Sequence, residues 1–321
     1  MIGSPTSLTQ LSIGEPRHEA IATVALIRAK VASGKQLGAI IDEMGSAVRL
    51  AGITEDSRLF SDPDASHAFV GATDDTAVAL AASDIGRWES SGNRPRSVVS
   101  AEYPGELHDI FDKPPLVFIQ GDWPTVMLAP SVAVVGTRKP SSQGIASARA
   151  VTVALVKRDY VINSGLAAGI DTVAHRAALD ANGRTNAVMG TGLAHVYPAE
   201  NATLAKEIVE SGGALVSPFF PEQGPTRWSF PMRNVVMSAL SLATIVIEAG
   251  ETSGARMQAR VALRHGRTVF LLGSLVRSHD WARKLAVDGA YGTRAIEINS
   301  PDDVLDRLSS SSTYGFQLAV A

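Results

Sequence analysis

From Ser97 onward, short runs of β-branched residues alternate with alanine-rich stretches of helical periodicity, and no other feature constrains the fold as strongly. The runs that predict strands are 98–99, 116–119, 132–135, 160–163, 185–189, 214–217, 243–247, 268–272 and 295–298. The stretches that predict helices are 145–157, 169–181, 202–211, 233–240, 255–264 and 301–308. This alternation is typical of a right-handed, mostly parallel, doubly wound α/β sheet.

The first 96 residues show a different pattern. Helical spacing of apolar residues predicts short helices at 18–32, 35–44, 45–50 and 73–88, and the polar, acidic stretch 54–72 predicts a loop. The segment 90–96, SSGNRPR, has the composition of a linker. We therefore expect a small helical domain with its linker at 1–96, an α/β domain at 97–308 and a flexible tail at 309–321.

Composition and charge narrow the class of protein. The chain has no cysteine, which excludes disulfides, thiol catalysis and cysteine–zinc sites and suits a reducing compartment. Its apolar runs are shorter than the ~20 residues of a membrane helix, and its first residues do not resemble a secretion signal. We therefore expect a cytoplasmic protein without a membrane partner. The formal charge is −7 over residues 1–130 and +4 over 131–321, which permits an anionic ligand on the second part.

The segment 132–144, VAVVGTRKPSSQG, has the form of a phosphate-binding turn. An apolar strand ends at Gly136, a small polar and basic loop follows, and a helix begins shortly afterwards. Free N–H groups at a helix start attract anions, and Arg138 and Lys139 add positive charge. The motif is neither a dinucleotide fingerprint nor a Walker loop, so its weight comes from similar loops downstream.

Five strand-end loops, including the long loop after Ser217, share this character, since each supplies glycines, small hydroxyls or arginine. Any one of them could be a tight turn that merely needs glycine, but together they indicate an anion-binding edge of the sheet. The candidate residues in these loops are Gly136, Thr137, Arg138, Lys139, Ser164, Gly165, Gly169, Gly190, Thr191, Gly192, Ser253 and Gly254.

Other candidate side chains have simpler interpretations. Asp171 and His175 lie four residues apart on one expected helix face, where we predict a helix cap and a structural hydrogen bond rather than a catalytic pair. Trp228 and Phe230 could stack nucleobases or simply pack a long loop. The histidines show no metal-binding spacing and no serine lies in a nucleophile elbow, so we expect no metal, no cofactor and no catalysis.

Several runs together resemble the DprA/Smf family of DNA-processing proteins. They include GTRKPSSQG, SGLAAGIDTVAHRAALDANGRTNAVMGTG, GGALVSPFF, RWSFPMRN, IVIEAGETSGARMQA and GRTVFLLG, preceded by YPGELHDIFDKPPLVFIQGD. The resemblance covers about residues 103–290 in order. It implies an extended Rossmann-like fold. By motif position it implies a DNA-contacting pocket at 136–138, the SGLAAGID turn and 190–192, and it adds Arg233 and Asn234.

The resemblance also implies a function. Proteins of this kind bind and protect incoming single-stranded DNA, assist RecA loading during natural transformation and recombination, and act as homodimers. The expected partners are therefore single-stranded DNA, a RecA-type recombinase and a second copy of the chain.

The chain departs from the family pattern at four places. Val235 stands where the family usually has a second arginine, ARMQA follows the serine–glycine pair, and 273–290 replaces the usual glycine- and asparagine-containing loop. No winged-helix domain is expected after Leu308. Two alternatives stay open: a nucleotide hydrolase of the cytokinin-activating type, which Gln258 near that family's glutamate position disfavours, and an interaction module with a weakened DNA site.

Overall fold

The computed structural model describes residues 4–30, 32–52, 69, 71–122 and 129–312. The chain forms two compact units. The first unit comprises residues 1–121, 191–195 and 216–225, and the second comprises 122–190, 196–215 and 226–321. The expected domain boundary at 96–97 falls within strand β1.

The first unit contains four described α-helices, which confirms its expected helical character. They are α1 (Pro16–Ala29), α2 (Gly34–Met44), α3 (Ala47–Ala51) and α5 (Asp75–Ser90), with 3₁₀ turns η1 (Leu8–Gln10) and η2 (Gly105–Leu107). Buried Glu19 on α1 accepts hydrogen bonds from Ser46 Oγ at 2.7 Å and from the amides of Ala47 and Val48 at 2.6 and 3.1 Å. The carboxylate thereby satisfies the free N–H groups at the start of α3 and joins two helices. The expected loop at 54–72 lies almost wholly outside the described residues.

A two-stranded antiparallel ribbon completes the first unit. Strand β1 (Arg94–Ser97) pairs with β2 (Leu116–Gly121), so the prediction of a linker at 90–96 and a strand at 98–99 was wrong. Buried Trp88 stacks on Phe220 with ring centroids 5.3 Å apart, and its indole N–H donates to Glu222 at 2.7 Å. These contacts, made to residues more than a hundred positions away, are invisible to local sequence patterns.

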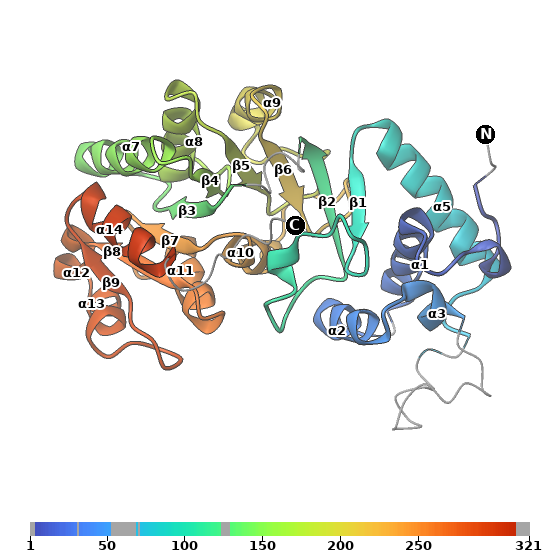
Figure 1. The fold of residues 1–321 in the computed structure, drawn as a ribbon. Helices are drawn as coiled ribbons and strands as arrows, with labels where there is room; N and C mark the ends of the chain where they lie inside the picture. Colours follow the sequence, from blue (N-terminus) through green and yellow to red (C-terminus); the bar gives the residue numbers. More distant parts are fainter. Residues whose placement is uncertain (1–3, 31, 53–68, 70, 123–128, 313–321) are drawn as a thin grey trace. The chain divides into compact units, whose positions relative to one another are not determined.

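The second unit is built on six parallel strands in the order β5–β4–β3–β7–β8–β9 (Figure 1). Their bounds are β3 (Ser131–Val135), β4 (Val161–Ser164), β5 (Thr185–Val188), β7 (Ala243–Val246), β8 (Thr268–Leu272) and β9 (Ile296–Ile298). The first two residues of β6 (Ala214–Ser217) also belong to this unit. The chain winds outward from β3 in one direction through β5 and in the other through β9, which confirms the expected doubly wound, Rossmann-like architecture.

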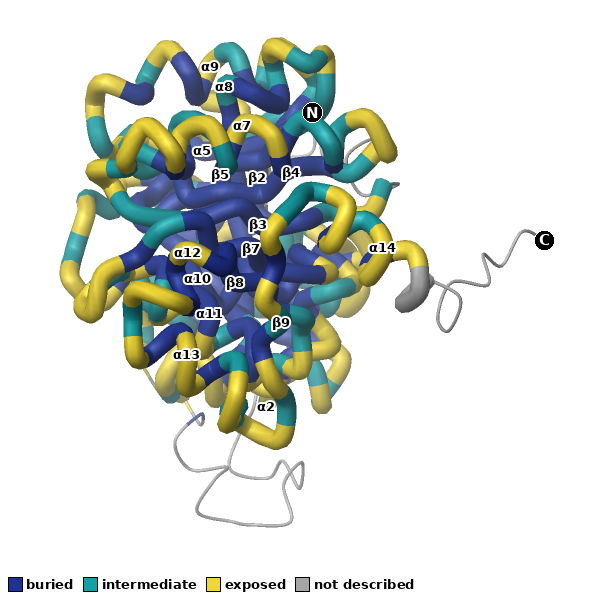
Figure 2. The backbone as a smooth tube through the Cα atoms, turned by 90° about the vertical axis from the view of Figure 1, so that its left-hand side faces the viewer, coloured by how far each residue is buried: buried dark blue, intermediate teal, exposed yellow. Residues whose placement is uncertain are grey.

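Helices flank this sheet on both faces (Figure 1). They are α7 (Ser142–Val156), α8 (Ile170–Asp180), α9 (Ala202–Glu210), α10 (Ser229–Ala239), α11 (Gly254–Arg264), α12 (Gly273–Ser278), α13 (Asp280–Val287) and α14 (Pro301–Ser312), with the 3₁₀ turn η3 (Ala199–Asn201). The segment 273–290, for which no helix was expected, thus contains two, and the expected tail begins inside α14. Figure 2 shows the strands buried beneath more exposed helices, as a parallel sheet covered on both faces requires.

His175 on α8 is a fully buried histidine in this core. Thr185 Oγ1 donates its only hydrogen to the carbonyl of Ile162 at 2.7 Å, so it must accept from His175 Nδ1, 2.7 Å away. The prediction of a structural hydrogen bond is confirmed. Nε2 of the same ring has no hydrogen-bond partner among the described atoms. Burial, followed by the nearby positive charges of Arg233 and Arg176, lowers the pKa of His175 to about 3.

This histidine predicts a loss of stability in mild acid. Because its pKa is about 3 in the folded chain and about 6.5 in the unfolded chain, the stability it contributes is present above pH 6.5 and falls as the pH drops towards 3. Between pH 7 and pH 5 the free energy of unfolding should fall by about 2 kcal/mol through this group alone. Denaturant unfolding of the wild type and His175→Gln across this range should show a flatter pH dependence in the variant. Exposed His195→Gln should leave the dependence unchanged.

Candidate functional site

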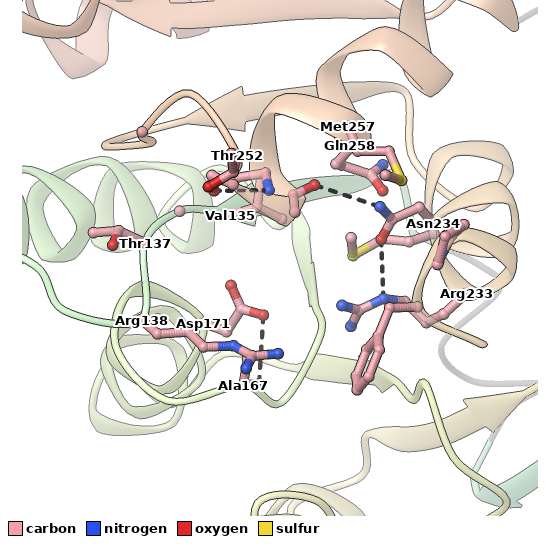
Figure 3. Close-up of a pocket in the computed structure, with 18 of the residues that line it drawn as sticks. Val135, Thr137, Arg138, Ala167, Asp171, Arg233, Asn234, Thr252, Met257 and Gln258 are labelled. Carbon is pink, nitrogen blue, oxygen red and sulfur yellow. Dashed lines mark hydrogen bonds between the residues drawn. The ribbon is translucent and has the colours of Figure 1, made fainter. Parts of the chain in front are cut away.

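A pocket of about 550 Å³ opens in the second unit at the carboxyl ends of the adjacent strands β3 and β7. The connections after these two strands leave towards opposite sides of the sheet, and such a switch point is where doubly wound folds bind ligands. The main contributors are the loop after β3, the loop after β7, and the first turns of α10 and α11 (Figure 3).

Seven of the fourteen predicted anion-binding residues line this pocket: Gly136, Thr137, Arg138, Arg233, Asn234, Ser253 and Gly254. Five others belong to the same unit but are not among its lining residues: Lys139, Ser164, Gly165, Gly169 and Gly190. Thr191 and Gly192 belong to the first unit, where the carbonyl of Thr191 accepts from Ser217 and the amide of Gly192 donates to Gln223.

Three of the predicted residues that do not line the pocket, Ser164, Gly169 and Gly190, pack close to the elements that form it. Ser164 Oγ donates to the carbonyl of Val134 at 2.7 Å, so its hydroxyl is engaged within the sheet. Gly169 has φ +82° and lets the start of α8 approach the Thr137–Arg138 backbone, where a Cβ would meet the Thr137 oxygen at 2.3 Å. Gly190 lies against the Phe230 ring, which a Cβ would meet at 2.7 Å. These glycines are needed for close packing around the pocket rather than for contact with a ligand.

Arg233 on α10 is a cation buried in the wall of the pocket, with only 9% of its surface exposed. Its Nε donates to Asn234 Oδ1 at 3.1 Å (Figure 3). Its Nη1 donates to the carbonyl of Val188 at 2.9 Å. Burial lowers the pKa of Arg233, and the carboxylate of Asp171 opposes this effect by favouring the charged form. The guanidinium is therefore held in place before any ligand arrives.

Asp171 is the acidic counterpart of this arginine. Its Oδ2 accepts from the amides of Gly165 and Ala167 at 3.1 and 3.4 Å, so it closes the turn that precedes α8. The N-cap of α8 is Gly169, so the expectation that Asp171 caps this helix was wrong. Burial raises the pKa of Asp171, whereas the charge of Arg233 and these N–H groups lower it. The carboxyl thus serves to position the turn and the arginine.

The start of α7 already holds an anion supplied by the chain itself. Glu248, which follows β7, accepts from the amide of Ser141 at 2.9 Å and from its hydroxyl. Gly144 is needed there, because a Cβ would lie 2.4 Å from the Glu248 carboxyl carbon. The N-cap residue of α7 thus pairs with a carboxylate of the chain itself, and phosphate binding at this helix start stays a prediction.

Arg138 and Phe230 form the outer part of the pocket. Arg138 is exposed, and its guanidinium carbon lies 5.7 Å from the centroid of the half-buried Phe230 ring. Trp228 has 57% of its surface exposed but is not a lining residue. Of the two aromatic residues predicted to stack bases, the structure therefore brings only Phe230 into the pocket.

The pocket also contains residues that the prediction missed. Arg227 adds a third lining arginine, and Met237 and Met257 supply apolar wall. Gln258 is 1% exposed, and neither its amide oxygen nor its amide nitrogen has a hydrogen-bond partner in the described part of the chain. Val235, at the position of the family's second arginine, is buried in α10. Only the high arginine content of 223–267 hinted at Arg227.

A family model described as DNA recombination-mediator protein A matches residues 96–308. The chain belongs to this family. The DNA processing protein DprA of Bacillus subtilis is 39% identical over 179 residues, which are 56% of this chain and 60% of that protein. The chain thus spans about 60% of the length of this curated relative.

Two solved structures of family members share the fold. DNA processing protein A (DprA) from Streptococcus pneumoniae aligns with a TM-score of 0.68 and 30% identity over 88% of this chain and 95% of that chain. DNA processing protein A from Helicobacter pylori, a structure described for that protein's single-stranded DNA binding mode, aligns with a TM-score of 0.58 and 27% identity over 65% and 94%.

No helix within the described part of this family member has the length and apolar character needed to cross a bilayer. Within the same ranges, no three histidine or acidic side chains gather as a metal site would require.

The packing of Arg233 on Gly165 yields a stability prediction. A Cβ at residue 165 would lie 1.7 Å from Arg233 Nη1, so Gly165→Ala must displace the buried guanidinium from its partners. We expect the free energy of unfolding to fall by about 1–3 kcal/mol, the usual cost of overpacking. Gly250→Ala is the matched control, since Gly250 lines the same pocket with open space around its Cα. Equal melting temperatures for the two variants would contradict this account.

Proposed function

We propose that this chain binds single-stranded DNA at the switch-point pocket, as the Helicobacter pylori relative's described binding mode suggests. The observation that carries the proposal is the arrangement of cations and an aromatic ring at one opening. Buried Arg233, exposed Arg138 and Arg227, and the ring of Phe230 all line the same pocket. Proteins that bind single strands combine such positive charge for phosphates with aromatic faces for bases.

In this proposal Arg233 and Arg138 contribute to binding in different ways. Arg233 is already fixed by Val188 and Asn234, so it supplies a preorganised positive field rather than a mobile contact. Arg138 is exposed and rests over Phe230, so it is free to grip a phosphate while a base takes its place on the ring. Readout of base sequence through these contacts is weak, because stacking tolerates every base.

The wider role follows from family membership. We infer that the chain protects incoming single strands and helps load a RecA-type recombinase on them during natural transformation and recombination, acting as a homodimer. Support for these partners comes from the family resemblance and not from a surface of this structure.

The proposal is tested by a fluorescence-anisotropy titration of labelled oligo-dT at several salt concentrations. Affinity should fall with salt, with a log–log slope of about −0.7 for each phosphate neutralised. Arg138→Ala should weaken binding and make the slope shallower by about 0.7, the contribution of one phosphate. The melting temperature should change little, because an exposed loop arginine contributes little to stability. Arg149→Ala, an exposed arginine on α7 paired with Asp180, is the control. An affinity that changes neither with salt concentration nor on Arg138→Ala would refute the proposed site.

We further propose that the chain binds without catalysing a reaction. The loop after β7 carries two carboxylates: Glu248, whose oxygens are engaged by Ser141, and Glu251, which pairs with Arg256. Asp171 is held by two backbone amides. Because each of these three carboxylates already has a partner within the chain, we expect none of them to act as a general base. Incubation with AMP, NAD or single-stranded DNA should yield no product by chromatography. Release of free base that is lost in Glu248→Gln would favour the hydrolase instead.

A further inference from the structure

A second groove, of about 390 Å³, runs along helix α11 in the same unit. It is lined by Glu251, Thr252, Ser253, Arg256, Met257, Arg260, Val261, Arg264 and Tyr291. Three of these residues, Thr252, Ser253 and Met257, also line the switch-point pocket, so the two hollows meet at the start of α11.

Three arginines, Arg256, Arg260 and Arg264, lie four residues apart on α11 and therefore on one face of the helix. At 1.5 Å of rise per residue, successive members are about 6 Å apart along the axis, which suits successive phosphates of an extended strand. Arg256 is partly occupied, since it donates to the carboxylate of Glu251 at 2.9 Å and lies over the Trp281 ring. Arg260 is exposed and forms no ion pair with any residue that the structure describes.

Tyr291 closes the far side of the groove in an unusual backbone conformation. The amides and carbonyls of Ala290 and Thr293 pair with each other at 2.8 and 3.1 Å, so Tyr291 and Gly292 form a two-residue hairpin turn. Both central residues have positive φ, +55° and +80°. Turns of this kind favour asparagine, aspartate or glycine, and a bulky aromatic residue there is strained. The tyrosine nevertheless keeps 58% of its surface exposed in the groove.

We propose that this groove continues the path of single-stranded DNA beyond the pocket. Phosphates lie on Arg260 and Arg264, and a base stacks on Tyr291. Three observations support a nucleic-acid strand as the occupant. The lining carries three arginines against one carboxylate that already pairs with Arg256. The groove shares three lining residues with the pocket. A strained residue is retained at the one position that presents an aromatic face, and such strain is expected where function requires it.

The inference rests on the proposed function of the pocket, and strand length separates the two sites. A strand of about four nucleotides fills the pocket alone, whereas one of about sixteen also reaches the groove. We expect Arg260→Ala to leave the affinity for the short strand unchanged. The same variant should weaken the affinity for the long strand several-fold and reduce its salt slope by about 0.7. Arg283→Ala on α13, an exposed arginine paired with Asp280 and absent from the groove lining, is the control.

Tyr291→Asn provides a test with two readouts that move in opposite directions. Asparagine tolerates positive φ, so the melting temperature should stay level or rise. The stacking face is lost, so affinity for the long strand should fall by about fivefold or more while affinity for the short strand stays the same. A lower melting temperature with unchanged long-strand affinity would show that the tyrosine is only a packing residue and would overturn the proposal.

The outcomes also distinguish the groove from the pocket. Suppose that Arg138→Ala lowers the affinity for both strands, and that neither Arg260→Ala nor Tyr291→Asn changes the ratio of long- to short-strand affinity. The proposed function of the pocket would then stand, and the groove proposal would fall. If the wild type binds neither strand, both proposals fall together. An acidic peptide that binds to the groove residues while long-strand affinity is insensitive to them would likewise overturn the assignment.

Discussion

The pocket depends on a buried guanidinium. Removing the charge of Arg233 from water is costly unless hydrogen bonds and an opposite charge compensate for it. The structure supplies a carbonyl from the end of β5, the neighbouring Asn234 side chain and the field of buried Asp171. It also needs Gly165, because a side chain there would occupy the position of the guanidinium. One cation thus links the end of β5, the turn before α8 and the first half of α10.

A second constraint lies on the other side of the switch point. At the start of α7, the Glu248 carboxylate accepts hydrogen bonds from the N-cap residue Ser141, and Gly144 provides the room for it. The carboxylate ties the strand end of β7 to the helix that follows β3, so the two loops of the crevice are cross-linked. Consequently the positive field for a ligand comes from arginine side chains and the start of α11 rather than from α7.

Pocket and groove belong to one folded unit. The two hollows share three lining residues at the start of α11, and each is also lined by arginines. The pocket is partly buried, with Arg233 fixed and methionines forming its apolar wall. The groove is lined by three arginines of α11 and an exposed tyrosine. A fixed interior cation favours defined placement of the first nucleotides, whereas the outer arginines extend contact along a flexible strand.

The sequence by itself determined the doubly wound sheet, because its alternating strand and helix patterns are local and repeat along the chain. Parallel topology then brings strand ends to one edge, so half of the fourteen predicted binding residues line the pocket. Short or polar elements were missed: β1 at Arg94–Ser97, and α12 and α13 within 273–290. Only the tertiary structure decided that Glu248 pairs with Ser141 at the start of α7, that Arg233 is buried, and that Tyr291 lines one groove with Arg260. These features depend on contacts between residues distant in sequence, which local periodicity does not encode.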